Sequence, residues 1–168
     1  WWGGFFRRML AYYDILFVQD EHNRKLLEEI GIRERVVVAG DTRYDRVLSI
    51  AAAARKIPEI ETFCHRHSLI IAGSTWPEDE ILLKEWFRHL PDNWKLIIAP
   101  HEVGPSHIAD LMKLFEGSFI LHSALGASTD ASRHRVLIVD NIGMLSSLYS
   151  YGALAYVGGG FRKRGLHN

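Results

Sequence analysis

The chain has little of several features that mark common classes of protein. It has a single cysteine, Cys64, among 168 residues, so no disulfide can form within it, which fits a reducing compartment. Its 20 basic and 20 acidic residues cancel, which argues against a nucleic-acid partner bound through bulk charge. No apolar run approaches the roughly 18–20 residues that span a bilayer. What remains is a chain with 48% hydrophobic residues, enough for one sizeable core.

Sequence motifs of several enzyme classes are also missing. The chain has no G-x-S-x-G and no H-E-x-x-H, so hydrolases with a nucleophile elbow and zincin proteases lack support. After Gly158 and Gly160, the third glycine of a dinucleotide fingerprint would fall at Lys163. His65 and His67 lie next to Cys64, but the chain has no second cysteine, and zinc sites need paired ligands at set spacing. We therefore expect neither a metal nor a cofactor.

A series of apolar runs, separated by helix-like segments, fills most of the chain. Continuous runs rich in Val, Ile and Leu predict buried parallel strands at 68–74, 94–100, 118–123, 134–140 and 153–160. Between them, helix start and stop signals or helical spacing predict helices at 77–90, 106–117 and 143–152. Such an alternation is typical of a doubly wound sheet. The predicted fold class is α/β, with a Rossmann-like parallel sheet.

The first part of the chain predicts a smaller unit. The runs 14–19 and 35–41 predict strands on either side of a helix at 21–31, which makes one βαβ unit. The Ala-rich segment 42–58 then predicts a connecting helix. We expect three parts, a small unit at 1–40, a connector at 41–67 and a second, larger unit at 68–168.

Ligands of an open parallel sheet bind beyond the carboxyl ends of the strands, where the strand order reverses. With the common order 3-2-1-4-5, this point lies between the predicted strands that end near 72 and 139. The turn Gly73-Ser74-Thr75 offers close backbone approach, two hydroxyls and the N-terminus of a helix, which suits an anion. The alternative is that Ser74 or Thr75 only caps that helix.

A second candidate turn follows the last predicted strand. Three glycines at 158–160 permit positive φ and close approach, and the basic run 162–164 follows them. The alternative is an exposed turn with solvated charges.

Five segments form a combination that is more specific than any one of them. They are AGDTRYDR (39–46), AGSTWPEDE (72–80), LIIAP (96–100), VLIVDNIGMLSSLYSYGALAYVGGG (136–160) and GLHN (165–168). With this combination, nearly the whole chain resembles the C-terminal half of the Kdo transferases. These glycosyltransferases transfer 3-deoxy-D-manno-octulosonic acid (Kdo) to a lipid A precursor in lipopolysaccharide biosynthesis.

The resemblance implies a GT-B architecture, in which two Rossmann-like domains face each other across a cleft. Residues 1–40 would be the C-terminal remnant of the N-terminal acceptor domain, and residues 68–168 would be the truncated domain that binds the donor CMP-Kdo. The lipid A precursor and the catalytic carboxylate would belong to the missing part of the N-terminal domain. We therefore expect a piece of a longer protein that holds no catalytic residue and is inactive alone. The full-length protein would act at the membrane surface, on the cytoplasmic face of the inner membrane. Because a lone βαβ unit buries little, we also consider a homodimer of the fragment.

The resemblance also assigns substrate-binding roles. The donor's phosphate or carboxylate would meet Gly73, Ser74 and Thr75, and the nucleotide would lie beside Pro100 and His101. The cytosine would be held by backbone groups of Ile142, Gly143, Met144 and Leu145. The sugar would lie beside Gly158, Gly159 and Gly160, and the phosphate-facing helix would begin at His167 and Asn168.

One position departs from the pattern of this family. Many members carry Pro-Arg-His where this chain has Pro100-His101-Glu102, and a neutral imidazole is a weaker phosphate partner than a guanidinium. Two alternatives stay open from the sequence, another GT-B transferase or UDP-sugar epimerase, and a non-catalytic α/β binding module.

Overall fold

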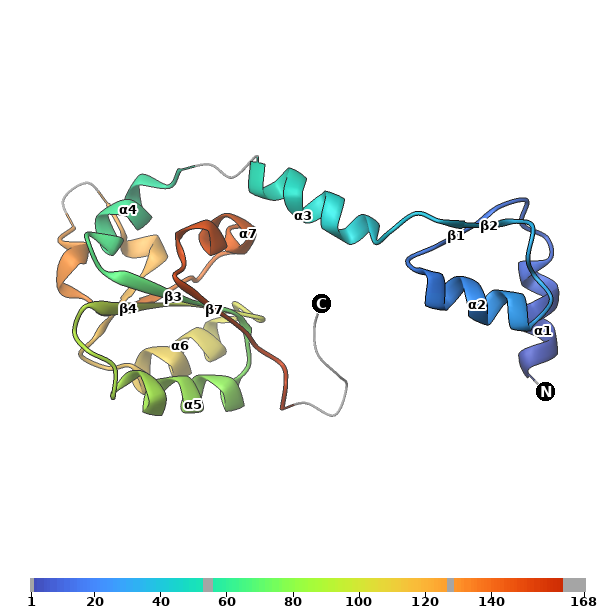
Figure 1. Cartoon of the computed structure of the whole chain (residues 1–168). Helices are drawn as coiled ribbons and strands as arrows, with labels where there is room; N and C mark the ends of the chain where they lie inside the picture. Colours follow the sequence, from blue (N-terminus) through green and yellow to red (C-terminus); the bar gives the residue numbers. More distant parts are fainter. Residues whose placement is uncertain (1, 53–55, 127–128, 162–168) are drawn as a thin grey trace. The chain divides into compact units, whose positions relative to one another are not determined.

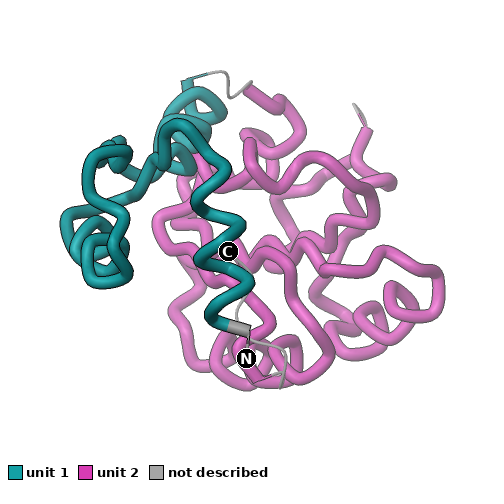
Figure 2. The backbone as a smooth tube through the Cα atoms, turned by 90° about the vertical axis from the view of Figure 1, so that its right-hand side faces the viewer, with its two compact units in different colours: residues 1–52 teal, residues 53–168 magenta. Residues whose placement is uncertain are grey.

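The computed structural model describes residues 2–52, 56–126 and 129–161. The chain divides into two units, unit 1 at residues 1–52 and unit 2 at residues 53–168, which Figure 2 shows in different colours. The boundaries that the sequence predicts, near residues 40 and 67, stay predictions.

Unit 1 contains the predicted βαβ arrangement. Its elements are α1 (Trp2–Leu10), β1 (Leu16–Val18), α2 (Glu21–Glu29), β2 (Val36–Val38) and α3 (Thr42–Ala52). β1 and β2 pair in parallel, with Leu16 opposite Val36. α2 begins where the Asp20 carboxylate accepts the Asn23 N–H at 2.7 Å, a normal N-terminal cap.

Unit 1 has almost no core. Only Ile32 and Val36 are buried apolar residues among its described positions, whereas Phe17 is 70% exposed. A two-stranded sheet with one helix buries little apolar surface, so the marginal packing of this unit follows from its size.

Unit 2 contains a five-stranded, all-parallel sheet and the helices around it. Its elements are α4 (Pro58–Cys64), β3 (Ser68–Thr75), α5 (Pro77–Phe87), β4 (Trp94–Pro100), α6 (Pro105–Leu114), β5 (Phe119–Leu121), the 3₁₀ turns η1 (His122–Ala124) and η2 (Ala131–Arg133), β6 (Val136–Ile138), α7 (Leu145–Leu148), η3 (Tyr149–Tyr151) and β7 (Leu154–Val157). The strand order is β5-β6-β4-β3-β7. The α/β fold class predicted from the sequence is confirmed.

The predicted strand order was wrong. In the order 3-2-1-4-5, β6 would lie beside β3, but β6 pairs with β4 and β5, and the neighbours of β3 are β4 and β7. The burial of the strands agrees with the observed order. All three residues of β6 are buried, as suits an interior strand, whereas β5 and β7 are partly exposed edge strands. The order therefore reverses between β3 and β7.

Helices cover both faces of the sheet (Figure 1). Successive residues of a strand point to opposite faces, so Ile70 packs with α5 and α6, while Ile71 packs with α4 and α7. Buried residues of the first face include Leu83 and Leu111, and those of the second include Leu148. The sheet is thus doubly wound, and the carboxyl ends of its strands come together at one edge, here called the carboxyl edge.

No helix in the described part of the chain is long and apolar enough to cross a membrane.

Candidate functional site

The turn after β3 lies at the centre of the carboxyl edge. Ser74 has a φ of 53°, which is unusual for a residue other than glycine, and the pairing with β4 shifts register between Gly73 and Thr75. Thr75 is fully buried, and its hydroxyl donates to the Glu80 carboxylate at 2.9 Å. Of the two hydroxyls, that of the half-buried Ser74 is therefore the one that a ligand can reach.

Gly73 brings a second loop to this turn. A Cβ at Gly73 would collide with the Tyr149 hydroxyl and would lie 2.7 Å from Leu145 Cδ1. Glycine at this position lets the side chains of α7 and η3 pack directly on the end of β3. This packing brings Leu145, and with it the loop after β6, to the switch point even though β6 itself is two strands away.

The loop after β6 is open to solvent at its start. Ile142 is 86% exposed, and Gly143 is exposed with a φ of 98°. The following Met144 and Leu145 are half-buried. Before this loop, the Asp140 carboxylate accepts hydrogen bonds from the backbone N–H and the hydroxyl of Ser123. These bonds link the segments that follow β5 and β6.

The glycine turn after β7, defined as Gly158–Gly160, packs on the turn after β3. The Gly158 N–H donates to the Gly73 carbonyl at 2.9 Å. A Cβ at Gly158 would collide with the Ser74 carbonyl and lie 2.6 Å from Thr75 Cα. Gly158 and Gly159 are buried, so Gly160 is the exposed residue of this turn.

The end of β4 joins the same cluster. Pro100 is buried, and the His101 N–H donates to the Thr75 carbonyl at 2.9 Å. The exposed His101 ring stacks on Trp76, with centroids 4.5 Å apart. The structure therefore brings together the predicted positions of three loops around β3, and it places Leu145 of the fourth against them. His167 and Asn168 lie outside the described residues, and all the binding roles stay predictions.

Two buried carboxylates were not identified from the sequence as site residues. Asp79 is 1% exposed and Glu80 is 3% exposed, both in the first turn of α5. Glu80 accepts from Thr75 and from His107 Nε2, which is 2.9 Å away. Asp79 accepts from Tyr156, and burial, followed by this hydrogen bond, raises the pKa of Tyr156 to about 12. The signal that could have found Asp79 is its place three residues after the helix N-cap, where acids commonly cap.

Acids dominate one side of the edge. A cavity of about 440 Å³ between the first turns of α5 and α6 is lined by Trp76, Pro77, Glu78, Glu102, Gly104, Ser106, His107 and Asp110. Because the first turn of α5 also contains a proline and a capping acid, it offers an anion fewer N–H groups than the sequence suggested. Ser74, Gly143 and Gly160, which do not line this cavity, are half-buried or exposed and carry no charge.

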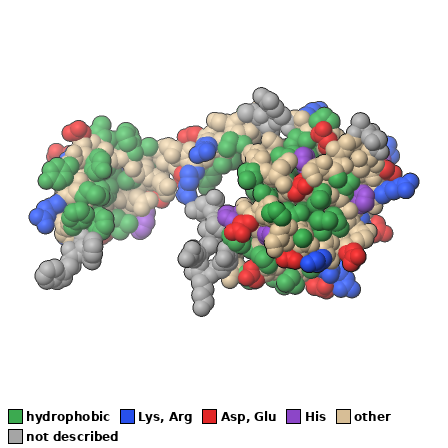
Figure 3. Space-filling model, turned by 180° about the vertical axis from the view of Figure 1, so that it is seen from behind, with side chains coloured by type: hydrophobic (Ala, Val, Ile, Leu, Met, Phe, Trp, Pro, Cys, Tyr) green, Lys and Arg blue, Asp and Glu red, His purple; other side chains and the backbone are tan. Residues whose placement is uncertain are grey.

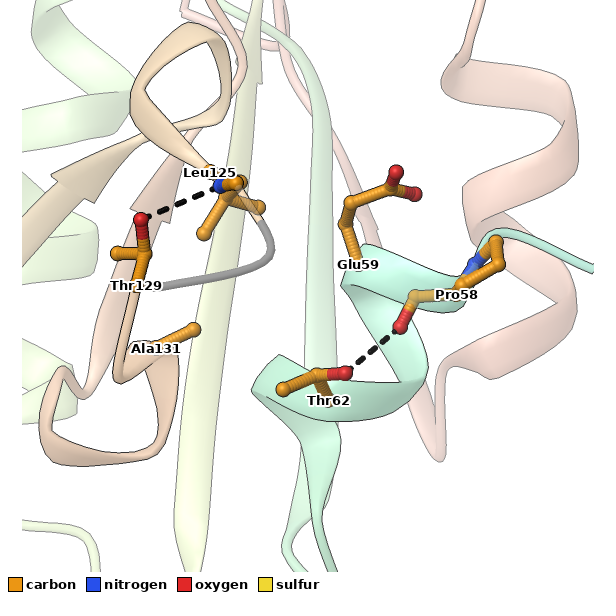
Figure 4. A pocket seen from close by; sticks show the side chains of 7 residues that line it. Pro58, Glu59, Thr62, Leu125, Thr129 and Ala131 are labelled. Atoms are coloured by element: carbon orange, nitrogen blue, oxygen red, sulfur yellow. Dashed lines mark hydrogen bonds between the residues drawn. The ribbon is translucent and has the colours of Figure 1, made fainter.

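Among the described residues, other hollows lie elsewhere on unit 2, and one of about 270 Å³ is an apolar hollow between α5 and β7. Two more contain polar side chains. One of about 270 Å³ lies between α4 and the turn before η2 (Figure 4), where Thr62 Oγ1 donates to the Pro58 carbonyl at 2.9 Å. The other, here called the basic hollow, has about 410 Å³ at the opposite edge of the sheet, and its cations are Lys84, Arg88, Lys113 and Arg135. Three of these four cations are paired with surface acids. Among the described residues, no group of three His, Cys, Asp or Glu side chains could hold a metal ion.

No family model matches the chain. It is 29% identical over 98% of its length to a 3-deoxy-D-manno-octulosonic acid transferase of Chlamydophila psittaci, of which it covers 38%. A protein of the same name from Haemophilus influenzae is 29% identical over 95% of the chain, which again covers 38% of it. A bifunctional glycosyltransferase/methyltransferase of Fusobacterium nucleatum is 29% identical over 96% of the chain, which covers 26% of it.

One solved structure has the same fold. The crystal structure of the C-terminal CMP-Kdo binding domain of WaaA from Acinetobacter baumannii matches with a TM-score of 0.53 and 17% identity, over 74% of this chain and 64% of that one. The resemblance to Kdo transferases found in the sequence is confirmed. The chain spans between 26% and 38% of the length of the curated relatives described here.

Proposed function

We propose that the chain is the donor-binding half of a glycosyltransferase that transfers Kdo from CMP-Kdo to a lipid A precursor. One observation carries this proposal. The identity of 29% to a Kdo transferase extends over 98% of the chain, so it is not confined to the buried strands that any α/β domain would share. The solved domain with the same fold is described as a CMP-Kdo binding domain, which supports the same donor.

The donor site would lie at the switch point of the sheet. There Ser74, Gly143 and Gly160 are reachable, and Leu145 packs against the end of β3. Backbone N–H groups and the Ser74 hydroxyl would receive the phosphate or carboxylate, and the loop 142–145 would hold the cytosine. Thr75, Gly158 and Gly159 are buried, so they would support the residues that contact the donor.

The choice of nucleotide tests the proposal directly. Equilibrium dialysis of the chain with labelled CMP, and with labelled UMP as the matched control, separates the candidate functions. We expect CMP to bind at least about tenfold more tightly, because a site built to hydrogen-bond one base leaves polar groups unpaired with the other. Tighter binding of UMP would favour a transferase or epimerase that uses UDP-sugars, and equal binding would contradict a site specific for cytidine. Binding of neither at millimolar concentration would favour a non-catalytic module.

The complete reaction requires more than this chain. We propose that the acceptor and the catalytic carboxylate belong to the remainder of a full-length protein, which would act at the cytoplasmic face of the inner membrane. The full-length protein should then form product from CMP-Kdo and a lipid A precursor, and the chain alone should form none. Product formed by the purified chain would contradict this division of roles.

Self-association of the chain is part of the same proposal. Apolar side chains gather on exposed surfaces of both units (Figure 3), and in unit 1 they include Phe5, Phe6, Phe17, Val37 and Val38. Exposed apolar surface of this kind favours association. Sedimentation velocity between about 5 and 200 µM should show a concentration-dependent dimer, since mass action favours it in this range. A single monomeric species throughout would exclude it.

A further inference from the structure

Two neighbouring carboxylates, Asp79 and Glu80, are buried at the carboxyl edge and have different partners. Glu80 faces the His107 ring, whose Nε2 is 2.9 Å away. Asp79 has only uncharged hydrogen-bond donors around it in the described part of the chain. A buried carboxylate is tolerated only when such donors replace its water, so the three donors that surround Asp79 need to be held in place.

The donors to Asp79 come from three separate segments. Asp79 Oδ2 accepts the Trp76 N–H at 3.0 Å and the Gly159 N–H at 2.9 Å. Asp79 Oδ1 accepts the Tyr156 hydroxyl at 2.6 Å. The turn after β3, the strand β7 and the glycine turn are thus joined through one side chain, an arrangement that we call the Asp79 clasp.

In the described part of the chain, few other hydrogen bonds hold the glycine turn. The ladder between β3 and β7 ends with the Gly158 N–H on the Gly73 carbonyl. The next described backbone link is the Gly159 N–H to Asp79, and Gly160 beyond it is exposed. Gly159 also has a φ of 93°, so this turn has no intrinsic preference for its conformation. Among the described hydrogen bonds, the one to Asp79 is thus the last that holds the glycine turn before Gly160.

We infer that Asp79 is a positioning residue of the donor site, which fixes the glycine turn beside Ser74 through the Asp79 clasp. This inference rests on the proposed function, because it is CMP binding that the clasp would support. It also explains why a negative charge stands close to a site for an anion. By charge alone Asp79 would weaken the binding of CMP, so its removal distinguishes positioning from electrostatics by the sign of the effect.

Three variants separate the two effects. Asp79→Ala removes the charge and all three acceptor contacts. Asp79→Asn removes the charge, but its amide oxygen can accept both N–H groups while its NH₂ donates to the Tyr156 oxygen. Glu78→Ala is the matched control, because it removes the same charge from the exposed neighbouring position of the same helix turn. CMP affinity is measured by dialysis, and amide hydrogen exchange of Gly159 by NMR on the ligand-free chain.

We expect Asp79→Ala to weaken CMP binding at least about tenfold and to speed the exchange of Gly159 at least about tenfold, as loss of a charge-assisted hydrogen bond should. Asp79→Asn should restore most of both, and Glu78→Ala should bind CMP as tightly as the parent or more tightly. Protected exchange of the core Ile97 amide checks that each variant is folded. If Asp79→Ala were misfolded, Tyr156→Phe, which removes one of the three donors, should still show a smaller loss in both measurements.

The inference is overturned if Asp79→Ala binds CMP as tightly as the parent, or if the exchange of Gly159 is unchanged. It is also overturned if Asp79→Asn weakens CMP binding as much as Asp79→Ala does, because the contacts that Asn can keep would then not be what positions the glycine turn. A parent chain that does not bind CMP at all would instead refute the proposed function, and the exchange of Gly159 would still report whether the clasp holds the turn.

Discussion

Gly158→Ala is the substitution that the packing of the carboxyl edge resists most clearly. The new methyl group would lie 2.6 Å from Thr75 Cα and 2.8 Å from Asp79 Oδ2, and it would also collide with the Ser74 carbonyl. Carbon atoms normally approach to about 3.5–4.0 Å, so the glycine turn would have to move by about 1 Å. Two of these three neighbours are backbone, so they cannot swing aside.

The cost can be worked from these contacts. Overpacking of this kind costs about 1–3 kcal/mol, and a displaced turn would also weaken the hydrogen bond from Gly159 to the Asp79 carboxylate, worth about 1.5–3 kcal/mol. We expect a loss of about 3 kcal/mol in the free energy of unfolding. For a domain of this size, such a loss lowers the melting temperature by about 10 °C.

Thermal unfolding followed by circular dichroism measures the effect. Gly104→Ala is the control, because a Cβ there has no atom within 4 Å and its φ is −65°. Its only expected cost is a weaker N-cap for α6, about 0.5–1 kcal/mol. If Gly158→Ala melted within about 2 °C of the parent, the close approach of the two turns would be refuted.

Two further substitutions test unit 2 away from the carboxyl edge and at the Asp79 clasp. Lys95 is 1% exposed, and its ammonium donates to the carbonyls of Phe63 and Ser132 at 2.9 and 2.7 Å. Lys95→Met should leave both carbonyls without this donor and lower the free energy of unfolding, measured by urea denaturation, by about 2–4 kcal/mol. A loss below about 0.5 kcal/mol, the typical range of a surface change, would contradict these contacts. The pKa of Tyr156, about 12, lies above its unfolded value of about 10, so its contribution to stability is fully present below pH 10 and is lost as the pH rises towards 12. Absorbance titration should show a tyrosine that ionises late and is missing in Tyr156→Phe, and ionisation of all tyrosines near pH 10 would contradict the hydrogen bond from Tyr156 to Asp79.

The strands could be predicted because their residues are apolar without interruption. A strand buried on both faces needs no alternation, so the runs that contain Ile70, Ile97 and Leu137 were recognisable one by one. Their order was not recognisable, because it depends on pairing between distant segments. Val136–Ile138 are completely buried because β6 lies between β4 and β5, and this position is not visible in a single run of apolar letters.

The candidate site could be predicted at the level of loops but not of atoms. Ligands gather at the carboxyl edge of any doubly wound sheet, and the glycines marked the turns there. The sequence did not reveal that protein atoms fill the space beside the Cα atoms of Gly73 and Gly158. In a sequence, a glycine that leaves room for a ligand looks the same as one that leaves room for neighbouring protein atoms. The role of Asp79 was missed for a similar reason, because acids at the start of a helix are usually explained by the helix dipole.

The most direct test of the account is to map where CMP binds on the isotopically labelled chain by NMR. We expect shifts of the amide signals of Ser74, Gly143, Leu145 and Gly160 when CMP is added to millimolar concentration. The basic hollow at the opposite edge is the competing site for an anion. Shifts confined to its residues, such as Lys84 and Lys113, or no shifts at all, would contradict a donor site at the carboxyl edge.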